Sequence, residues 1–471
     1  MAGQGSYPPI GDYALIGDCH SAALISREAS IEWCCLPRFD SGSAFATILD
    51  RGRGGFCRIG PAHSERWEYS RRYVEDTLVL ETELEGPSGS AKLIDCFTIA
   101  QSPRGPAERQ ILRVIEGSRG AVEFEIRVAP RFDYGQVRPW IRRHSHRLHS
   151  AIGGNDCLLV WCEGELREDP QHELVGTVTV GAGDRIHLSM AYCPPELIDR
   201  GEYAEPDART LDGRLEHTIR WWRSFAGSVQ LEGSDEPGAR RSAITLKALT
   251  YAPTGAIIAA PTTSLPEVIG GARNWDYRYA WVRDSSFSSR AFAAVGCNTE
   301  ADAFRAFIMR SAAGHAEDLQ VLYGVAGERR IRAEVLEGLE GYRGSAPARA
   351  GNDATTQDQL DAYGELVNLS WRWHRRGHSP SDDDWRFLVS LIDHAATKWA
   401  EPDCGIWEWP GKPDHFVHSK VLCWSALDRG IRLADECMRR GPTRRWQKAR
   451  DAIRREIERQ GYDRKRGIYL Q

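Results

Sequence analysis

Residues 273–284 combine the side-chain types that bind a polar ring. The segment reads Arg-Asn-Trp-Asp-Tyr-Arg-Tyr-Ala-Trp-Val-Arg-Asp, so four aromatic rings lie among three arginines and two aspartates. Aromatic faces offer flat apolar area at little cost in side-chain entropy, while guanidinium and carboxylate groups form directional hydrogen bonds. A sugar ring has apolar C–H faces and a rim of hydroxyls that match both. The segment therefore predicts a carbohydrate-binding site.

Glu408 is the second chemical candidate, because it stands between Trp407 and Trp409 and shortly before Pro410. Apolar neighbours disfavour a carboxylate and raise its pKa, so this side chain could stay protonated near neutral pH and donate to a leaving oxygen. Spacing alone favours a simpler interpretation, a glutamate on a surface loop whose flanking tryptophans pack inward. Asp284 likewise fits an N-cap for a helix that starts at Ser285, a position compatible with ligand binding.

Other polar patterns carry less information. His415 and His418, with nearby Cys404, have i, i+3 spacing but no further zinc-type ligand at a suitable distance. Three aspartates are expected to start helices or face solvent: Asp353, Asp358 and Asp361. The sequence contains no phosphate-binding loop and no nucleophile-elbow serine. We expect no metal ion and no cofactor.

The apolar pattern divides the chain into two halves that must position these residues. Over residues 10–200 apolar and polar residues alternate in short runs, as in 122–128, which predicts an antiparallel β-sandwich over residues 1–210. Beyond Leu211 the period becomes helical, and a helical linker over 211–235 leads to a helical domain over 236–471. The expected helices cover 215–225, 239–251, 285–295, 301–313, 355–371 (with a capping box at Thr355), 382–399, 417–438 and 444–459. Both candidate segments lie in the connections, where catalytic groups are often carried.

Composition bounds the possible partners. The 471 residues carry a formal net charge of −5, and basic residues do not alternate with aromatic ones as in a nucleic-acid groove. A signal peptide and an 18-residue apolar run are both missing, so we expect a cytoplasmic protein that binds neither nucleic acid nor membranes. Twelve cysteines without a regular framework are expected to be buried thiols. A homo-oligomer is left open.

Several blocks, in this order, resemble glycoside hydrolase family 15, which contains glucoamylases, glucodextranases and bacterial trehalases. The C-terminal blocks are 254–266, 273–284, 339–345, 351–352, 359–365, 405–408 and 415–421. The blocks 10–18 and 31–40 resemble the sandwich domain of the trehalase-like bacterial branch. The resemblance covers nearly the whole chain.

The resemblance implies a β-sandwich followed by an (alpha/alpha)6 barrel, and hydrolysis of a terminal α-glucosidic bond with inversion. Such enzymes use two carboxyl groups roughly 6.5 to 9.5 Å apart, one as general acid and one to activate water. By resemblance Glu408 is the general acid, and Arg283 and Asp284 hold the hydroxyls of the terminal glucose. The subsite would be lined by Tyr277, Trp281 and Trp407.

Two departures from the family pattern bear on the activity. Starch-degrading glucoamylases typically carry a second glutamate after the acid, where this chain has Trp409, which favours trehalose or another short substrate. The family's general base lies on a late barrel loop that we expect beyond Gln471, and about seven of twelve barrel helices are visible. We therefore expect a truncated barrel of poor stability with weak or no hydrolysis. A glycoside phosphorylase and an inactive sugar-binding fragment remain alternatives.

Overall fold

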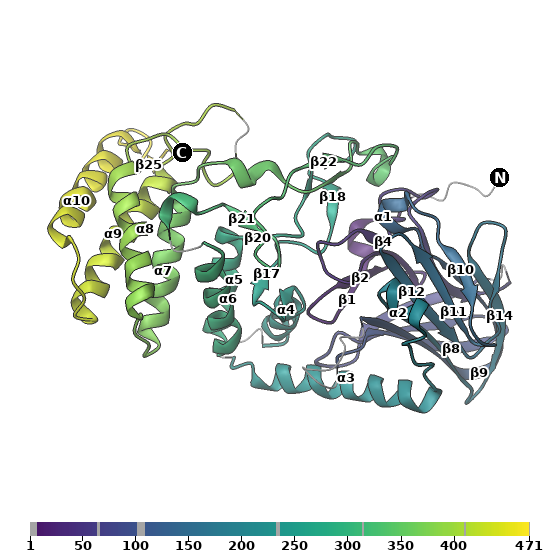
Figure 1. Ribbon diagram of the computed structural model, residues 1–471. Helices are drawn as coiled ribbons and strands as arrows, with labels where there is room; N and C mark the ends of the chain where they lie inside the picture. The colour runs from purple at the N-terminus through teal and green to yellow at the C-terminus, as the bar shows by residue number, and fades with distance from the viewer. Residues whose placement is uncertain are drawn as a thin grey trace. The chain divides into compact units, whose positions relative to one another are not determined.

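The computed structural model describes residues 7–63, 66–100, 109–231, 236–312, 315–408 and 411–470 (Figure 1). The chain forms two compact units. The sheet unit comprises Met1–Tyr251, Ala260–Arg278 and Glu334–Ala350, and the helical unit comprises Ala252–Ala259, Tyr279–Ala333 and Gly351–Gln471. Each unit is therefore built from three separate stretches of sequence.

The sheet unit is dominated by antiparallel strands. Nine of them form a continuous path in the order β1-β2-β3-β5-β9-β15-β12-β11-β10, and others pair beside it. The strands are β1 (Ala14–Gly17), β2 (Ala22–Ile25), β3 (Ser30–Cys35), β4 (Ser43–Phe45), β5 (Phe56–Pro61), β6 (Glu68–Tyr73), β7 (Leu80–Glu85), β8 (Gly89–Phe97), β9 (Gln110–Ala129), β10 (Trp140–Arg143), β11 (Leu148–Gly153), β12 (Asp156–Cys162), β13 (Arg167–Glu168), β14 (Leu174–Gly181) and β15 (Arg185–Tyr192). The prediction of an antiparallel N-terminal half is confirmed.

Strand β9 joins the two halves of this sheet. Its first part pairs with β8 and β15, and its second part pairs with β5 and β14. The predicted alternation is present, because Val122, Phe124, Ile126 and Val128 are all at most 1% exposed. Their side chains pack in one core with apolar residues from both halves, such as Leu188 of β15. The alternate side chains of β9 thus contribute to one apolar core that both halves of the sheet share.

The sheet unit also contains helices and short strand pairs. The helices are α1 (Phe132–Gly135), α2 (Pro195–Arg200), α3 (Ala208–Ser228) and α4 (Glu236–Ala248). Helix α3 is capped by Asp207, whose carboxylate accepts from the amide of Thr210. The short strands of this unit pair as β18 (Thr263–Pro266) with β19 (Asn274–Asp276), and β22 (Glu334–Val335) with β23 (Arg349–Ala350).

The helical unit contains the other long helices. They are α5 (Val282–Ala294), α6 (Asn298–Ser311), α7 (Asp361–Arg375), α8 (Asp382–Lys398), α9 (Val417–Glu436) and α10 (Thr443–Gln460). Helix α7 packs against α5, α8 and α9. At Gly364 an added Cβ would lie 2.3 Å from the carbonyl oxygen of Leu422 in α9, so this glycine permits close packing of the two helices. A β-sheet domain followed by helices is therefore confirmed as the fold class.

Two predicted helix starts are wrong. Helix α5 begins at Val282 with Trp281 at the N-cap position, so Asp284 lies inside the first turn instead of capping it. Residues 353–356 form a separate 3-10 helix, and α7 begins only at Asp361, so Thr355 forms no capping box. The structure has a capping box at Ser381 of α8, where the side chains of Ser381 and Asp384 bond to each other's backbone amides.

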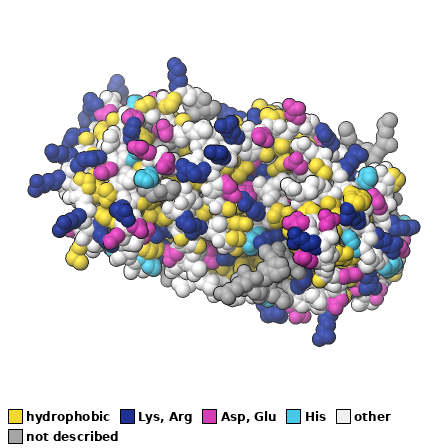
Figure 2. All heavy atoms as spheres, in the orientation of Figure 1, with side chains coloured by type: hydrophobic (Ala, Val, Ile, Leu, Met, Phe, Trp, Pro, Cys, Tyr) yellow, Lys and Arg dark blue, Asp and Glu magenta, His cyan; other side chains and the backbone are white. Residues whose placement is uncertain are grey.

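The surface carries both signs of charge. Figure 2 shows Lys and Arg side chains interspersed with Asp and Glu over the visible face. Among the described residues, no helix has both the length and the apolar character needed to cross a membrane.

Candidate active site

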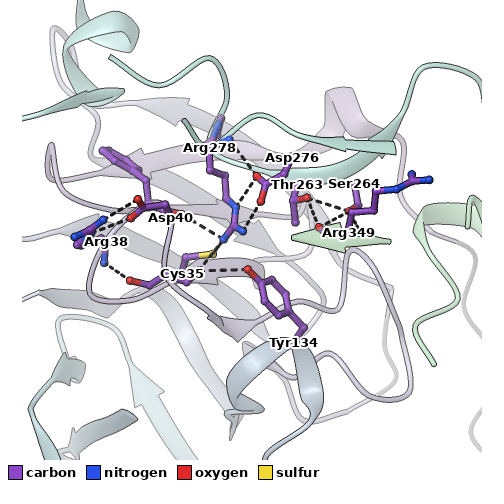
Figure 3. A network of polar contacts seen from close by, with 12 residues as sticks. Cys35, Arg38, Asp40, Tyr134, Thr263, Ser264, Asp276, Arg278 and Arg349 are labelled. Atoms are coloured by element: carbon purple, nitrogen blue, oxygen red, sulfur yellow. Dashed lines mark hydrogen bonds and ion pairs between the residues drawn. The ribbon is translucent and has the colours of Figure 1, made fainter. Parts of the chain in front are cut away.

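The structure divides the segment 273–284 between the two units, after Arg278. In the sheet unit, the Arg278 guanidinium is buried and donates to both oxygens of Asp276, at 2.9 and 2.6 Å. It also donates to the Ser41 carbonyl at 2.7 Å and contacts the Cys35 sulfur at 3.3 Å (Figure 3). Arg278 and Asp276 therefore hold the segment to the strands of the sheet unit.

The same network fixes a second returning stretch of chain. The hydroxyls of Thr263 and Ser264 donate to the carbonyl oxygen of Arg349, at 2.6 and 3.0 Å (Figure 3). In sequence, Tyr277 lies between the two residues of the buried ion pair, and its carbonyl accepts from the amide of Ala260 at 2.9 Å. Tyr277 belongs to the sheet unit, and its predicted role as a wall of the sugar subsite stays a prediction.

In the helical unit, Trp281 and Arg283 are positioned by the start of α5. Strand β20 (Ala280–Trp281) pairs with β21 (Leu322–Tyr323), which fixes the residue that precedes the helix. Trp281 is 1% exposed, and Arg283 follows on the first turn with a side chain that is 16% exposed. Both side chains reach the loop that precedes α9.

Asp403 organises that loop. It forms an antiparallel bridge with Asp414 across the base of the loop. Its buried carboxylate accepts from the amide of Leu360 at 3.0 Å and from the hydroxyl of Ser419 at 2.7 Å. One carboxylate thus ties the loop to the first residues of α7 and of α9.

Glu408 lies on this loop and faces Trp281 and Arg283. Its Oε1 accepts from the indole N–H of Trp281 at 2.9 Å and from the guanidinium of Arg283 at 3.1 Å. Arg283 also donates to the carbonyl of Ile406, so one side chain holds both the backbone and the carboxyl group of the loop. The φ angle of Glu408 is 54°, in the left-handed region where non-glycine residues are strained and which occurs often at active sites.

The structure brings Trp281, Arg283, Asp284 and Glu408 together. Asp284 accepts from the guanidinium of Arg283 at 2.9 Å, and its side chain is 42% exposed. Trp407 is 75% exposed, so its ring presents a flat face to solvent beside Glu408. Trp409 and Pro410, which also entered the sequence prediction, lie outside the described residues.

Three further titratable residues lie close by, and the sequence prediction gave none of them a role in this site. Asp361 starts α7, as expected, but it is 1% exposed, so the expectation that it faces solvent is wrong. Glu365 follows one turn later and is also buried, while His418 lies in the first turn of α9 with its Nδ1 3.7 Å from an oxygen of Asp361. The sequence offered one signal for this cluster: Asp361 and Glu365 have i, i+4 spacing in α7, and no basic residue lies between them.

Burial shapes the protonation of this cluster. It raises the pKa of Glu408, although Arg283 and Gln359 favour the ionised form. Burial raises the pKa of Asp361 to about 6 and that of Glu365 to about 7. Burial and the charge of Arg283 both lower the pKa of His418. The cluster can therefore hold protons near neutral pH, as proton transfer to a leaving group requires.

The described residues contain no group of three or more His, Cys, Asp or Glu side chains arranged to hold a metal ion. His415 and His418 therefore form no such group with Cys404. All twelve cysteines are free thiols, and ten of them are buried.

Comparison with known proteins agrees with a carbohydrate-active site. The family described as "Glycosyl hydrolases family 15" matches residues 235–471, and the domain described as "Trehalase-like, N-terminal" matches residues 1–210. A trehalase of Mycolicibacterium smegmatis is 35% identical over 498 residues, which cover 99% of this chain and 72% of that protein. These matches define the chain as a glycoside hydrolase. It belongs to glycosyl hydrolase family 15, as the sequence blocks predicted.

Other relatives are similar over the same extent. A trehalase of Mycobacterium tuberculosis is 34% identical in an alignment that covers 99% of this chain and 70% of that trehalase. A trehalase of Thermoplasma volcanium is 30% identical in an alignment that covers 99% of this chain and 73% of that trehalase. A solved structure, the family GH92 alpha-mannosidase of Bacteroides thetaiotaomicron, has 9% identity and a TM-score of 0.40, covering 98% of this chain and 64% of that one.

Proposed function

We propose that this chain hydrolyses the α-glucosidic bond of trehalose with inversion, with Glu408 as the general acid. The observation that carries the proposal is the geometry of Glu408, a largely buried carboxyl group whose Oε1 is held by Trp281 and Arg283. Burial raises its pKa, which suits a group that must deliver a proton to the glycosidic oxygen. The trehalases among its relatives support trehalose as the substrate.

Each neighbour has a proposed task. Arg283 and Asp284 bind hydroxyls of the terminal glucose, since a guanidinium donates to them and a carboxylate accepts from them. Trp407 lines the subsite, and Trp281 both lines it and orients Glu408. Inversion also requires a second carboxyl group, which activates water on the opposite face of the sugar. Helices α5 to α10 are proposed to belong to an (alpha/alpha)6 barrel.

The test compares trehalose, maltose and isomaltose as substrates of the purified chain and follows the product anomers by NMR. Inverting cleavage of trehalose releases one β-glucose and one α-glucose at the start of the reaction, before mutarotation. A rate that depends on phosphate and yields glucose phosphate would instead indicate a glycoside phosphorylase. Binding of glucose in calorimetry without turnover of any substrate would indicate the sugar-binding alternative and overturn the proposal.

A further inference from the structure

Asp361 is a buried carboxyl group that the proposed mechanism does not use. It is the first residue of α7, and its side chain is 1% exposed. Within the described part of the chain, neither of its oxygens has a hydrogen-bond partner. Burying an unpaired polar group costs free energy, and such exceptions in folded proteins call for an explanation.

Charged and titratable groups from α5, from α9 and from the loop before α9 face Asp361. His418 is the nearest of them, with Nδ1 3.7 Å from Oδ2, a distance too long for a hydrogen bond. The His418 Nδ1 also has no hydrogen-bond partner among the described residues. The full set comprises Arg283 from α5, Asp403 and Glu408 from the loop before α9, His418 and Cys423 from α9, and Glu365 from α7 itself.

Three carboxyl groups, those of Asp284, Glu408 and Asp361, interact with the positive charge of Arg283. Its guanidinium contacts Asp284 at 2.9 Å and Glu408 at 3.1 Å, and its charge also favours the ionised form of Asp361. One guanidinium cannot fully stabilise three carboxylates, so the group retains a proton to higher pH than isolated acids would. Titration of such interacting groups is coupled, because ionisation of one acid opposes ionisation of the next.

We propose that Asp361 is a positioning residue that competes with Glu408 for the charge of Arg283 and so keeps the transferable proton on Glu408. Asp361 touches no substrate in this arrangement and donates no proton to it. Once Asp361 is ionised, its negative charge offsets part of the guanidinium charge and makes ionisation of Glu408 less favourable. This inference rests on the proposed role of Glu408 as the general acid.

Infrared spectroscopy of the protein labelled with ¹³C in glutamate carboxyl groups tests the proposal directly. The band of Glu408 is identified by its loss in Glu408→Gln, and its protonation is followed as a function of pH. In Asp361→Asn we expect the midpoint of Glu408 deprotonation to fall by roughly one pH unit, as for removal of one nearby charge. Asp361→Leu is a second neutral variant of similar shape, for use if the asparagine variant does not fold.

Asp428→Asn is the matched control. Asp428 is 5% exposed in α9 and pairs with Arg429, Arg432 and Arg450. This control should leave the Glu408 midpoint unchanged. An unchanged midpoint in the Asp361 variants, or an equal shift in Asp428→Asn, would overturn the proposal.

The kinetic measurement separates this inference from the proposed function. In Asp361→Asn the basic limb of the pH profile of kcat/KM on trehalose should move to lower pH by the same amount as the infrared midpoint. With α-glucosyl fluoride, whose leaving group needs no proton, that limb should not move. If Glu408→Gln keeps full activity on trehalose, the role of Glu408 fails; if only the Asp361 variants lack the shift, Asp361 alone loses its role.

Discussion

Arg278 and Arg283 belong to one short segment of sequence, and each forms an ion pair with an aspartate close by in the chain. Arg278 is buried with one carboxylate, and its Nη1 donates to the backbone carbonyls of Phe39 and Ser41. Arg283 keeps 16% of its side chain exposed, and three carboxyl groups draw on its charge. One carboxylate thus balances the charge of Arg278, whereas Arg283 has more carboxyl groups around it than its single charge can balance.

The difference shows how charge balance separates a structural ion pair from a candidate catalytic one. A buried arginine that is paired with a single carboxylate has no surplus acid beside it, so this pair serves the fold. An excess of carboxyl groups around one guanidinium raises the pKa of at least one of them, which provides a proton for chemistry.

Replacing the proposed acid should have the largest effect. Glu408→Gln removes the proton donor and should lower kcat on trehalose by a factor of about 10² to 10⁴. The amide keeps the shape of the side chain, so calorimetry should detect nearly unchanged affinity for glucose. Glu401→Gln, at an exposed ion pair with Lys398, is the control and should leave kcat unchanged. Comparable losses in both variants would remove Glu408 from its assigned role.

The structural arginine should matter most for stability. Arg278→Met leaves the buried carboxylate of Asp276 unpaired and should lower the free energy of unfolding by about 3–5 kcal/mol. Arg283→Met should lower it by only about 1 kcal/mol, because the exposed Asp284 can be hydrated and Glu408 can take up a proton. Urea denaturation monitored by tryptophan fluorescence measures both. Equal losses of stability would show that the contrast between the two arginines is wrong.

The same Arg283→Met variant should lose binding of the terminal glucose. Hydrogen bonds to a charged group contribute about 1.5–3 kcal/mol, so Kd for glucose should rise roughly 10- to 150-fold in calorimetry. Arg290→Met, on the same helix, is the control and should bind glucose as the unmodified chain does. Unchanged affinity in Arg283→Met would exclude it from the subsite.

Asp361 should make stability depend on pH. Its pKa is raised to about 6 in the folded chain, so between about pH 4 and 6 the folded state holds a proton that the unfolded state has lost. This group therefore destabilises the fold as pH rises through that window. The unfolding free energy of Asp361→Asn, relative to the unmodified chain, should increase by about 1–2 kcal/mol from pH 4 to pH 7. A constant difference across urea titrations at these pH values would contradict the assignment.

Trp407 should give the smallest change in stability. Its side chain is 75% exposed, so Trp407→Ala should alter the unfolding free energy by no more than about 0.5 kcal/mol. If its ring forms part of the sugar subsite, KM for trehalose should rise while the melting temperature stays constant. An unchanged KM would leave this tryptophan outside the subsite.

The fold class followed from local pattern, while the composition of the site did not. The alternation over 122–128 lies within β9, and the predicted helices from α3 to α10 occur close to their expected positions. Glu408 and Arg283 stand in recognisable blocks and meet in the structure. The sequence predicted a helix start at Asp361 but not its burial, which comes from packing of α7 against α5, α8 and α9.

Arg278 illustrates the same limit. In sequence it is one of three arginines in an aromatic segment, with no local feature that separates it from Arg283. Its acceptor at Ser41 lies more than 200 residues away in the chain. Whether an arginine serves the fold or a ligand therefore depended on partners that only the tertiary structure identifies.

The interrupted path of the chain also has a consequence for biosynthesis. One apolar core of the sheet unit packs Trp33 and Leu49, from the first fifty residues, against Leu339 and Tyr342. During translation the N-terminal strands leave the ribosome first, yet this core cannot close until about three hundred further residues have been added. A nascent chain must therefore keep that apolar surface shielded while α5 and α6 of the helical unit emerge, and slow elongation before residue 334 would prolong its exposure to chaperones and to aggregation.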